Sequence, residues 1–185
     1  MTPNQKQGIL NSVVKNYGKK ALRTILVAYK EISFNSPLDD EFLESDLILI
    51  SILGIMDPLR VEIPKSIHIC QKAGITVRMV TGDNIDTAVA IAKKAGILRT
   101  SYEINELTYE VIEGERFNKL CGGLEDVIIG EKPDEKIEKK IVNLEVFKTI
   151  VSELKVLARS SPKDKQTLVC GLKELNNVVA VTGWF

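Results

Sequence analysis

An alternation of apolar runs and amphipathic stretches constrains the fold of this chain more than any other feature. Leu47–Met56 and Ile75–Val80 are apolar runs of strand length. Val61–Ala73 and Asn84–Lys94 carry apolar residues at helical spacing, and a glycine follows each of them closely, as it commonly does at a helix end. Strands and helices that alternate with short connections predict right-handed βαβ units and a parallel sheet.

The same patterns predict further elements along the chain. Leu47–Met56 is almost continuously apolar, as is typical of a strand buried on both faces of a parallel sheet. Asn35–Asp46 is predicted to be a surface connection, and Glu131–Lys140, whose charges alternate in sign, a solvated loop or an exposed helix. The remaining elements are expected to be helices over Lys6–Lys19, Leu144–Leu154 and Pro162–Leu175, and strands over Leu22–Ile32, Lys155–Arg159 and Val178–Val181.

The composition excludes several classes of protein. The 185 residues include 25 Lys and Arg and 25 Asp and Glu, so the net charge is zero and favours neither nucleic acid nor an anionic membrane surface. The longest apolar run covers ten residues, whereas a helix that spans a bilayer needs about 20. Cys70, Cys121 and Cys170 are far apart and are predicted to be buried, reduced thiols, with which the single His68 cannot form a histidine-based metal site.

Polar residues follow the predicted strand Ile75–Val80 directly and form a first candidate site. Ligands of open parallel sheets bind beyond the C-terminal ends of the strands. Thr81 offers a hydroxyl, Gly82 leaves its backbone N–H accessible, and a helix N-terminus with unpaired N–H groups comes next. This arrangement suits a phosphate group. It suits equally well an ordinary helix start, in which Asp83 or Asn84 caps the helix.

A second candidate site lies at the start of the predicted helix Pro162–Leu175. Ser161 and Asp164 have capping-box spacing. Lys163 and Lys165 then fall in the first helical turn, where a cation costs about 0.3–1 kcal/mol unless an anion is nearby. The alternative is a pair of exposed lysines screened by solvent. With the hydroxyl of the first site, Lys165 would complete a two-sided phosphate clamp.

Other parts of a phosphoryl-transfer site are not found in the sequence. Such chemistry needs a carboxylate nucleophile or an attacking water, and normally Mg²⁺ held by acidic residues. No predicted strand ends in an Asp-Lys-Thr-type motif, and Asp164-Lys165-Gln166 falls inside a predicted helix. No metal-binding residues are assigned, and no Walker A loop, zinc motif or Gly-x-Ser-x-Gly elbow occurs.

Three blocks of sequence resemble a known family. They are MDPLR at Met56–Arg60, AGITVRMVTGDN at Ala73–Asn84 and VLARSSPKDK at Val156–Lys165. They are similar to the phosphorylation domain of P-type cation-transporting ATPases, and most similar to the plasma-membrane-type calcium pump branch. The resemblance runs collinearly from about Leu22 to Gly183.

The resemblance implies a fold and a domain organisation. The fold would be α/β, a Rossmann-like parallel sheet of the haloacid-dehalogenase type that is incomplete here, with an α+β remnant at the N-terminus. Residues 1–56 would be the C-terminal remnant of the nucleotide-binding domain, and residues 57–185 a partial phosphorylation domain. The missing central strand would leave unpaired sheet edges, so we expect marginal solubility or self-association.

The resemblance also implies roles for particular residues. Thr81 and Gly82 match the residues that contact the transferred phosphate, and Lys165 matches the lysine that stabilises the phosphoryl group and its aspartyl acceptor. Four further residues match positions that contact the nucleotide or join the two domains: Arg23, Asp57, Arg60 and Asp83. The family's Asp-Lys-Thr-Gly-Thr motif and its Mg²⁺-binding Asp-Gly-x-Asn-Asp segment have no counterpart.

The expected function therefore has two levels. The parent would be an ATP-driven cation pump, for Ca²⁺ by its branch, that works through an aspartyl phosphate with ATP and Mg²⁺ as cofactors. The chain would be a cytoplasmic segment of that membrane protein, with no membrane or nucleic-acid contact of its own. Alone, it is expected to bind no cofactor tightly and not to hydrolyse ATP. The alternatives are a soluble haloacid-dehalogenase-type phosphatase and a non-catalytic binding module derived from a pump domain.

Overall fold

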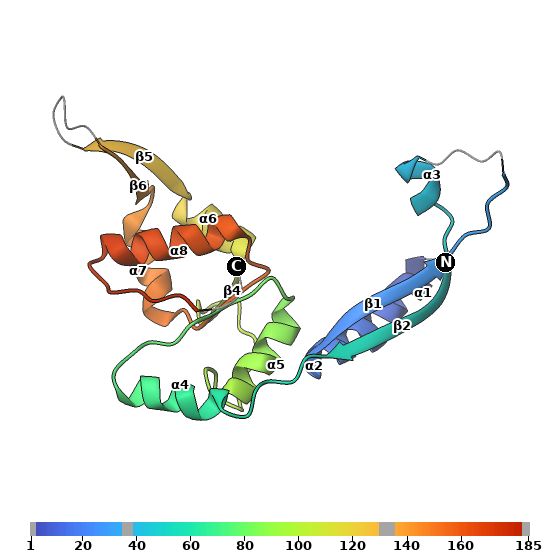
Figure 1. Cartoon of the computed structure of the whole chain (residues 1–185), viewed down its shortest axis with the longest axis horizontal. Coiled ribbons are helices and arrows are strands. Elements are labelled where there is room, and N and C mark those ends of the chain that lie inside the picture. The colour runs from blue at the N-terminus through green and yellow to red at the C-terminus, as the bar shows by residue number, and fades with distance from the viewer. Residues whose placement is uncertain (1–2, 35–38, 130–135, 183–185) are drawn as a thin grey trace. The chain divides into compact units, whose positions relative to one another are not determined.

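The computed structural model describes residues 3–34, 39–129 and 136–182, which belong to two compact units, Met1–Pro58 and Leu59–Phe185 (Figure 1). In the first unit a continuous helical stretch precedes a two-stranded antiparallel sheet. The predicted helix over Lys6–Lys19 is confirmed. The bounds of the elements are α1 Pro3–Ile9, the π-helix η1 Leu10–Val14, α2 Lys15–Lys19, β1 Leu22–Tyr29, α3 Asp40–Glu44 and β2 Ile48–Met56.

A close approach between helix and sheet explains one glycine of this unit. A Cβ atom at Gly54 on β2 would lie 2.9 Å from Leu22 Cδ1 and 3.0 Å from Tyr17 Cδ2 on α2. Glycine therefore lets the aromatic ring of Tyr17 approach the backbone on one face of the hairpin closely. Within the predicted connection Asn35–Asp46, the described residues form α3, whose N-cap Asp39 accepts a hydrogen bond from Phe42 N at 2.8 Å.

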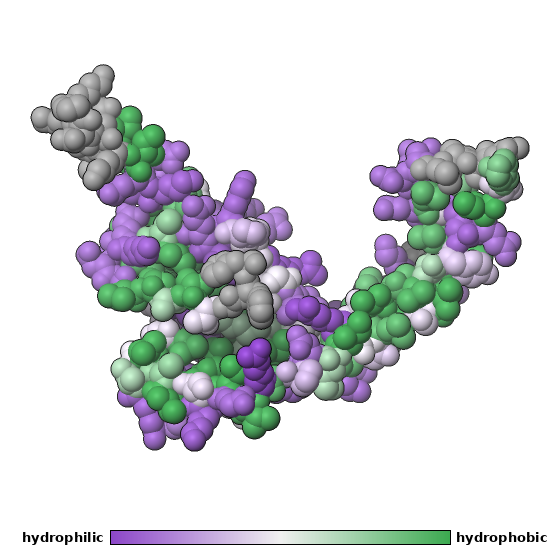
Figure 2. Space-filling model, viewed as in Figure 1, coloured by the Kyte–Doolittle hydropathy of each residue, from purple (hydrophilic) through white to green (hydrophobic). Residues whose placement is uncertain are grey.

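The prediction of a doubly buried parallel strand over Leu47–Met56 is wrong. β2 pairs antiparallel with β1, and Ile25 stands opposite Leu53 on the face away from Tyr17. These two side chains are 48% and 50% exposed, and Figure 2 shows a hydrophobic surface over β1 and β2. A continuous apolar run has no alternation from which its pairing partner or direction could be deduced, so the run alone could not distinguish the two kinds of strand.

The second unit is built on a parallel sheet with the strand order β3-β7-β4, which confirms the predicted parallel α/β architecture. Leu157 of the central strand packs into one apolar cluster with Phe117 and Phe147, whereas Val156 and Ala158 pack into another. Helices therefore cover both faces, because successive side chains of a strand point to opposite sides. The elements of the sheet and its helices are α4 Ile63–Lys72, β3 Met79–Val80, α5 Ile85–Ala95, β4 Val111–Glu113, α6 Gly114–Cys121, α7 Leu144–Glu153, β7 Val156–Ala158 and α8 Pro162–Glu174.

Three predicted segments of this unit differ from the structure. The strand predicted over Ile75–Val80 is reduced to β3, and Val178–Val181 forms no strand because no described residue hydrogen-bonds to it as a sheet neighbour. The described part of Glu131–Lys140 is neither loop nor helix: β6 (Lys136–Ile141) pairs antiparallel with β5 (Leu124–Ile129). Asp126 stands opposite Lys139, so the alternating charges of this segment complement those of its partner strand. Residues 131–135 lie outside the described residues.

The cysteines are less uniform than expected. All three are free, but only Cys121 is buried, and Cys70 and Cys170 are half-buried. Burial raises the pKa of the Cys121 thiol to about 11. The predicted buried face of α4 is likewise only half covered, since Ile63, Ile67 and Cys70 are its least exposed residues.

Candidate functional site

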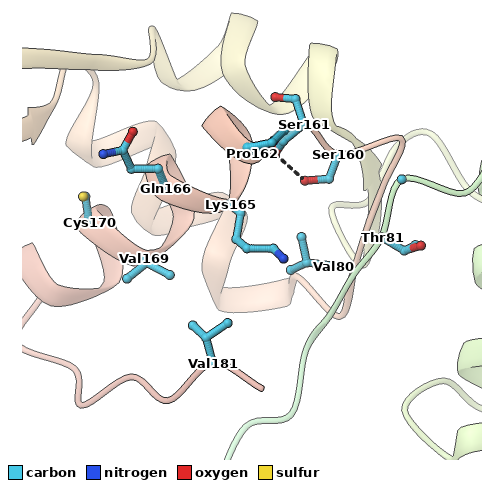
Figure 3. A pocket seen from close by; sticks show the side chains of 11 residues that line it. Val80, Thr81, Ser160, Ser161, Pro162, Lys165, Gln166, Val169, Cys170 and Val181 are labelled. Atoms are coloured by element: carbon cyan, nitrogen blue, oxygen red, sulfur yellow. Dashed lines mark hydrogen bonds between the residues drawn. The ribbon is translucent and has the colours of Figure 1, made fainter. Parts of the chain in front are cut away.

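A pocket of about 640 Å³ lies beyond the C-terminal end of β3 and beside the first turns of α8 (Figure 3). Thr81, Gly82 and Lys165, the three residues predicted to handle phosphate, all line it. Much of the remaining lining is apolar and comes from α8 and from the segment after it. The full lining is Val80, Thr81, Gly82, Ser160, Ser161, Pro162, Lys165, Gln166, Val169, Cys170 and Val181.

The parallel pairing of β3 with β7 brings the two predicted sites together. Thr81 N donates to Leu157 O at 3.0 Å, and Ser160 N donates to Thr81 O at 2.9 Å, so the strand ladder continues past the formal ends of both strands. Because parallel strands end at the same edge of a sheet, the segments after them become neighbours. Residues about 80 apart in sequence thereby share one pocket.

The start of α8 directs Lys165 toward that pocket. Ser161 forms the predicted capping box with Asp164: Asp164 N donates to Ser161 Oγ at 3.3 Å, and Ser161 N donates to Asp164 Oδ2 at 2.7 Å. The Lys165 side chain is half-buried, and Figure 3 shows its amine extending from α8 toward the end of β3. Lys163, in the same turn, is exposed and does not line this pocket.

Thr81 is held by its neighbour Asp83. The Thr81 hydroxyl donates to Asp83 Oδ2 at 3.0 Å and accepts from Asp83 N at 3.1 Å, and in Figure 3 it points away from the Lys165 amine. The cap of α5 is Asn84, whose side chain accepts from Thr87 N at 3.0 Å. Of the two capping residues considered from the sequence, Asn84 therefore has that role, and Asp83 instead fixes the rotamer of Thr81.

Packing does not explain the glycine at position 82. A Cβ atom there would have Ser160 O, at 3.9 Å, as its nearest neighbour, which is an ordinary contact distance. The absence of a side chain instead leaves the backbone of this turn open to the pocket. That is the property a phosphate oxygen would require in order to approach a backbone N–H group.

A buried carboxylate anchors the turn that carries Lys165. Asp164 is 4% exposed, and besides Ser161 N it accepts a hydrogen bond from Asn118 Nδ2 of α6. A Cβ atom at Gly114, the first residue of α6, would lie 2.9 Å from Asp164 Cγ and 3.0 Å from Arg159 O. Sequence reasoning identified the capping box but missed Asn118 and Gly114, because no local pattern links α6 to α8.

The other predicted site residues lie elsewhere. Arg23 stands opposite Ile55 on the hairpin of the first unit, and Asp57 follows β2 in the same unit. Arg60 is exposed just before α4, and its carbonyl accepts from Ile63 N at 3.1 Å. None of these three lines the pocket.

Two kinds of residue near the site were not found from the sequence. Gln166, Val169 and Cys170 line the pocket and lie one to five residues after Lys165; helical spacing from Lys165 identifies Val169 as its neighbour on α8. Arg78 donates from Nη2 to Val151 O at 2.8 Å and from Nε to Leu154 O at 3.1 Å, and so caps the end of α7. Burial lowers the pKa of Arg78.

The described residues contain no group of three or more His, Cys, Asp or Glu side chains arranged to hold a metal ion. Among them, no helix is both long enough and apolar enough to cross a membrane.

Comparison with known proteins agrees with the three sequence blocks. Residues 1–62 match the family described as P-type ATPase, cytoplasmic domain N. Over 98% of its length the chain is 40% identical to plasma membrane calcium-transporting ATPase 1 of Mus musculus and 38% identical to plasma membrane calcium-transporting ATPase 3 of Homo sapiens. Nearly the whole chain is thus similar to a segment of plasma membrane calcium-transporting ATPases.

Its similarity to the calcium-pump relatives covers a small part of those proteins. The chain spans 14% of the length of the two relatives named above, and 15% of plasma membrane calcium-transporting ATPase 2 of Oreochromis mossambicus, to which it is 40% identical. The chain is therefore similar to one segment of such a protein, and its first 62 residues are the part that matches the cytoplasmic domain N family.

Proposed function

We propose that these residues form the phosphate-handling segment of an ATP-driven calcium pump, located on the cytoplasmic side of the membrane. One observation carries this proposal: Thr81, Gly82 and Lys165, which the family resemblance assigns to the phosphoryl group, line one pocket although they come from distant parts of the chain. The pocket lies at the C-terminal edge of a parallel sheet, where ligands of such sheets bind.

The fold supports a haloacid-dehalogenase-type assignment for residues 57–185. The parallel sheet has helices on both faces, and the end of β3, the segments that follow β3 and β7, and the first turns of α8 surround the pocket. Residues 1–56 would belong to the nucleotide-binding domain, with Arg23 contacting the nucleotide, and Asp57 and Arg60 would form the hinge between the domains. The match of residues 1–62 to cytoplasmic domain N supports the first of these assignments.

The three residues assigned to the phosphoryl group would have separate tasks. The Lys165 ammonium would neutralise the charge of a phosphoryl group, and the backbone at Gly82 would donate hydrogen bonds to its oxygens. The Thr81 hydroxyl would have to turn from Asp83 to donate to the same group. In the whole protein ATP would supply the phosphoryl group, and Mg²⁺ would offset its charge; the 185 residues alone are not expected to hydrolyse ATP.

Titration of the chain with orthovanadate, followed by backbone NMR shifts, tests the pocket. The amides of Thr81, Gly82 and Lys165 should shift, with affinity in the millimolar range, because only part of the clamp is present. Lys165→Gln should abolish these shifts, whereas Lys173→Gln, at the other end of α8, should leave them unchanged. Absence of shifts at all three amides would contradict the proposal.

A chimaeric pump tests the activity of the whole protein. The matching segment of plasma membrane calcium-transporting ATPase 1 of Mus musculus would be replaced by these 185 residues. In membrane vesicles the chimaera should form an acid-stable phosphoenzyme from ATP and accumulate Ca²⁺, and its Lys165→Gln variant should do neither. A chimaera that reaches the membrane and binds ATP but forms no phosphoenzyme would count against the assignment.

A further inference from the structure

A second pocket, of about 630 Å³, lies between α6, the β5–β6 hairpin and α8. It is separate from the phosphate pocket, although Gln166 lines both. Three lysines from three different elements meet in it: Lys119 of α6, Lys139 of β6 and Lys163 of α8. The full lining is Asn118, Lys119, Gly122, Gly123, Leu124, Lys139, Lys163, Gln166 and Thr167, with no acidic residue among them.

The three lysines form no salt bridge with any described residue. All three are exposed, and no ion pair within the described part of the chain includes any of them. Asp126 stands opposite Lys139 in the hairpin, but the two form no salt bridge. The nearby carboxylate of Asp164 is buried and already accepts hydrogen bonds from Asn118 and Ser161.

Helix electrostatics do not account for this arrangement. Lys119 lies in the last turn of α6, where the negative end of the helix dipole favours a cation. Lys163 lies in the first turn of α8, where the dipole disfavours one, and Lys139 is on a strand. A multiply charged anion in the pocket would offset both the repulsion among the lysines and the unfavourable position of Lys163.

The backbone between α6 and β5 adds an uncharged donor. Gly122 and Gly123 both have positive φ, 74° and 76°, and a Cβ atom at Gly123 would meet nothing within 4 Å. The N–H group of Gly123 donates to no described residue. An open backbone N–H group beside lysine ammonium groups is a recurrent means of holding phosphate oxygens.

We propose that this pocket binds an anion that carries two or more phosphate groups. Three cations on separate elements match several charges better than a single phosphate, and the volume exceeds what one phosphate group fills. The ligand could be a soluble polyphosphate or the phosphorylated headgroup of a lipid, since both present the same linked or neighbouring phosphates. Because Lys163, Gln166 and Thr167 lie on the first two turns of α8, such a ligand would also contact the helix that carries Lys165.

Titration of the 185-residue chain with inorganic triphosphate, observed by NMR at low salt, tests the proposal. The amides of Asn118, Gly122, Gly123 and Thr167 should shift and saturate, and inorganic phosphate should bind about tenfold more weakly because it makes fewer charged hydrogen bonds. Affinity should also fall as salt is added, since exposed charges are screened. Absence of saturable shifts in this pocket would overturn the proposal.

Two triple variants separate this pocket from general charge effects. Lys119→Gln, Lys139→Gln and Lys163→Gln together should weaken triphosphate binding by about tenfold or more. The matched variant, with Lys65→Gln, Lys94→Gln and Lys173→Gln, removes the same charge from lysines that line neither pocket and should leave the affinity within about twofold. Equal losses in the two variants would show non-specific attraction and overturn the assignment.

Two further experiments distinguish a lipid headgroup from a soluble ligand, and binding at this pocket from binding at the phosphate pocket. Sedimentation with phosphatidylcholine vesicles, with and without phosphatidylinositol bisphosphate, tests the headgroup; binding of free triphosphate without vesicle binding assigns a soluble ligand. Lys165→Gln should remove the vanadate shifts at Thr81 and Gly82 and leave the triphosphate shifts at Gly122 and Gly123. Failure at one pocket is thus distinguishable from failure at the other.

Discussion

At the scale of single residues, Gly114 lies where α6 packs against the turn that precedes α8. A methyl group there would lie 2.9 Å from Asp164 Cγ and 3.0 Å from Arg159 O, both of which are fixed by hydrogen bonds or backbone. Gly114→Ala should therefore lower the free energy of unfolding by about 1–3 kcal/mol, measured by urea denaturation. Gly82→Ala, whose Cβ atom would meet nothing closer than 3.9 Å, should change stability little.

The carboxylate of Asp164 gives a second prediction at this scale. It is 4% exposed and accepts hydrogen bonds from both Ser161 N and Asn118 Nδ2. Asp164→Asn would turn an amide N–H₂ group toward one of these donors and should cost about 1–3 kcal/mol of stability. Vanadate affinity should fall with it, since the turn that carries Lys165 is loosened. Asp86→Asn on α5, outside the pocket lining, should leave vanadate binding unchanged.

The three thiols should differ in reactivity. Burial raises the pKa of Cys121 to about 11, whereas Cys70 and Cys170 are half-buried. At pH 8 an aromatic disulfide reagent should label Cys70 and Cys170 and reach Cys121 only after unfolding. Because the folded pKa of Cys121 is raised, the unfolded chain loses this proton first, and stability should fall as pH rises from about 9 to 11. Cys121→Ala should remove that part of the alkaline slope.

At the scale of elements, Arg78 connects the segment before β3 to the end of α7. Its guanidinium donates to Val151 O, in the last turn of α7, and to Leu154 O of the residue that follows the helix. Arg78→Ala should destabilise the second unit by about 1–3 kcal/mol in urea unfolding, since buried acceptors lose a charged donor. Arg78→Lys should recover only part of this, because an ammonium group cannot reproduce the two-nitrogen geometry. An unchanged midpoint in Arg78→Ala would exclude the capping role.

The elements that could be predicted from sequence are those determined by local chemistry. α8 begins directly after its predicted cap Ser161, α5 begins directly after Asn84, one of the two caps that the sequence allowed, and Gly96 ends α5 with a φ of 79°. β2 and β6 could not be predicted correctly, because strand pairing depends on residues that are distant in sequence. The same limit applies to the site: Thr81 and Lys165 carry local signals, but the Asn118–Asp164 contact joins residues 46 apart and has none.

At the scale of the whole molecule, the apolar face of the β1–β2 hairpin should govern association in solution. Ile25 and Leu53 stand opposite each other on the face away from Tyr17, and both are about half exposed. Burial of such a face in a second copy would be favourable, and β2 carries no charged residue that would oppose pairing at its edge. We therefore expect the chain to self-associate at micromolar concentrations, as light scattering would show.

Charges placed on that face should reverse the association. Ile25→Lys combined with Leu53→Lys should yield a monodisperse monomer, because association would then bury two unpaired ammonium groups. As a control, Val61→Lys combined with Ile137→Lys adds the same charge outside the β1–β2 hairpin, at residues that are 91% and 72% exposed. This control should leave association largely intact. If the second pair dissolves the assemblies as well as the first, net charge and not the β1–β2 face controls them. A monodisperse unsubstituted chain would contradict the role of this face altogether.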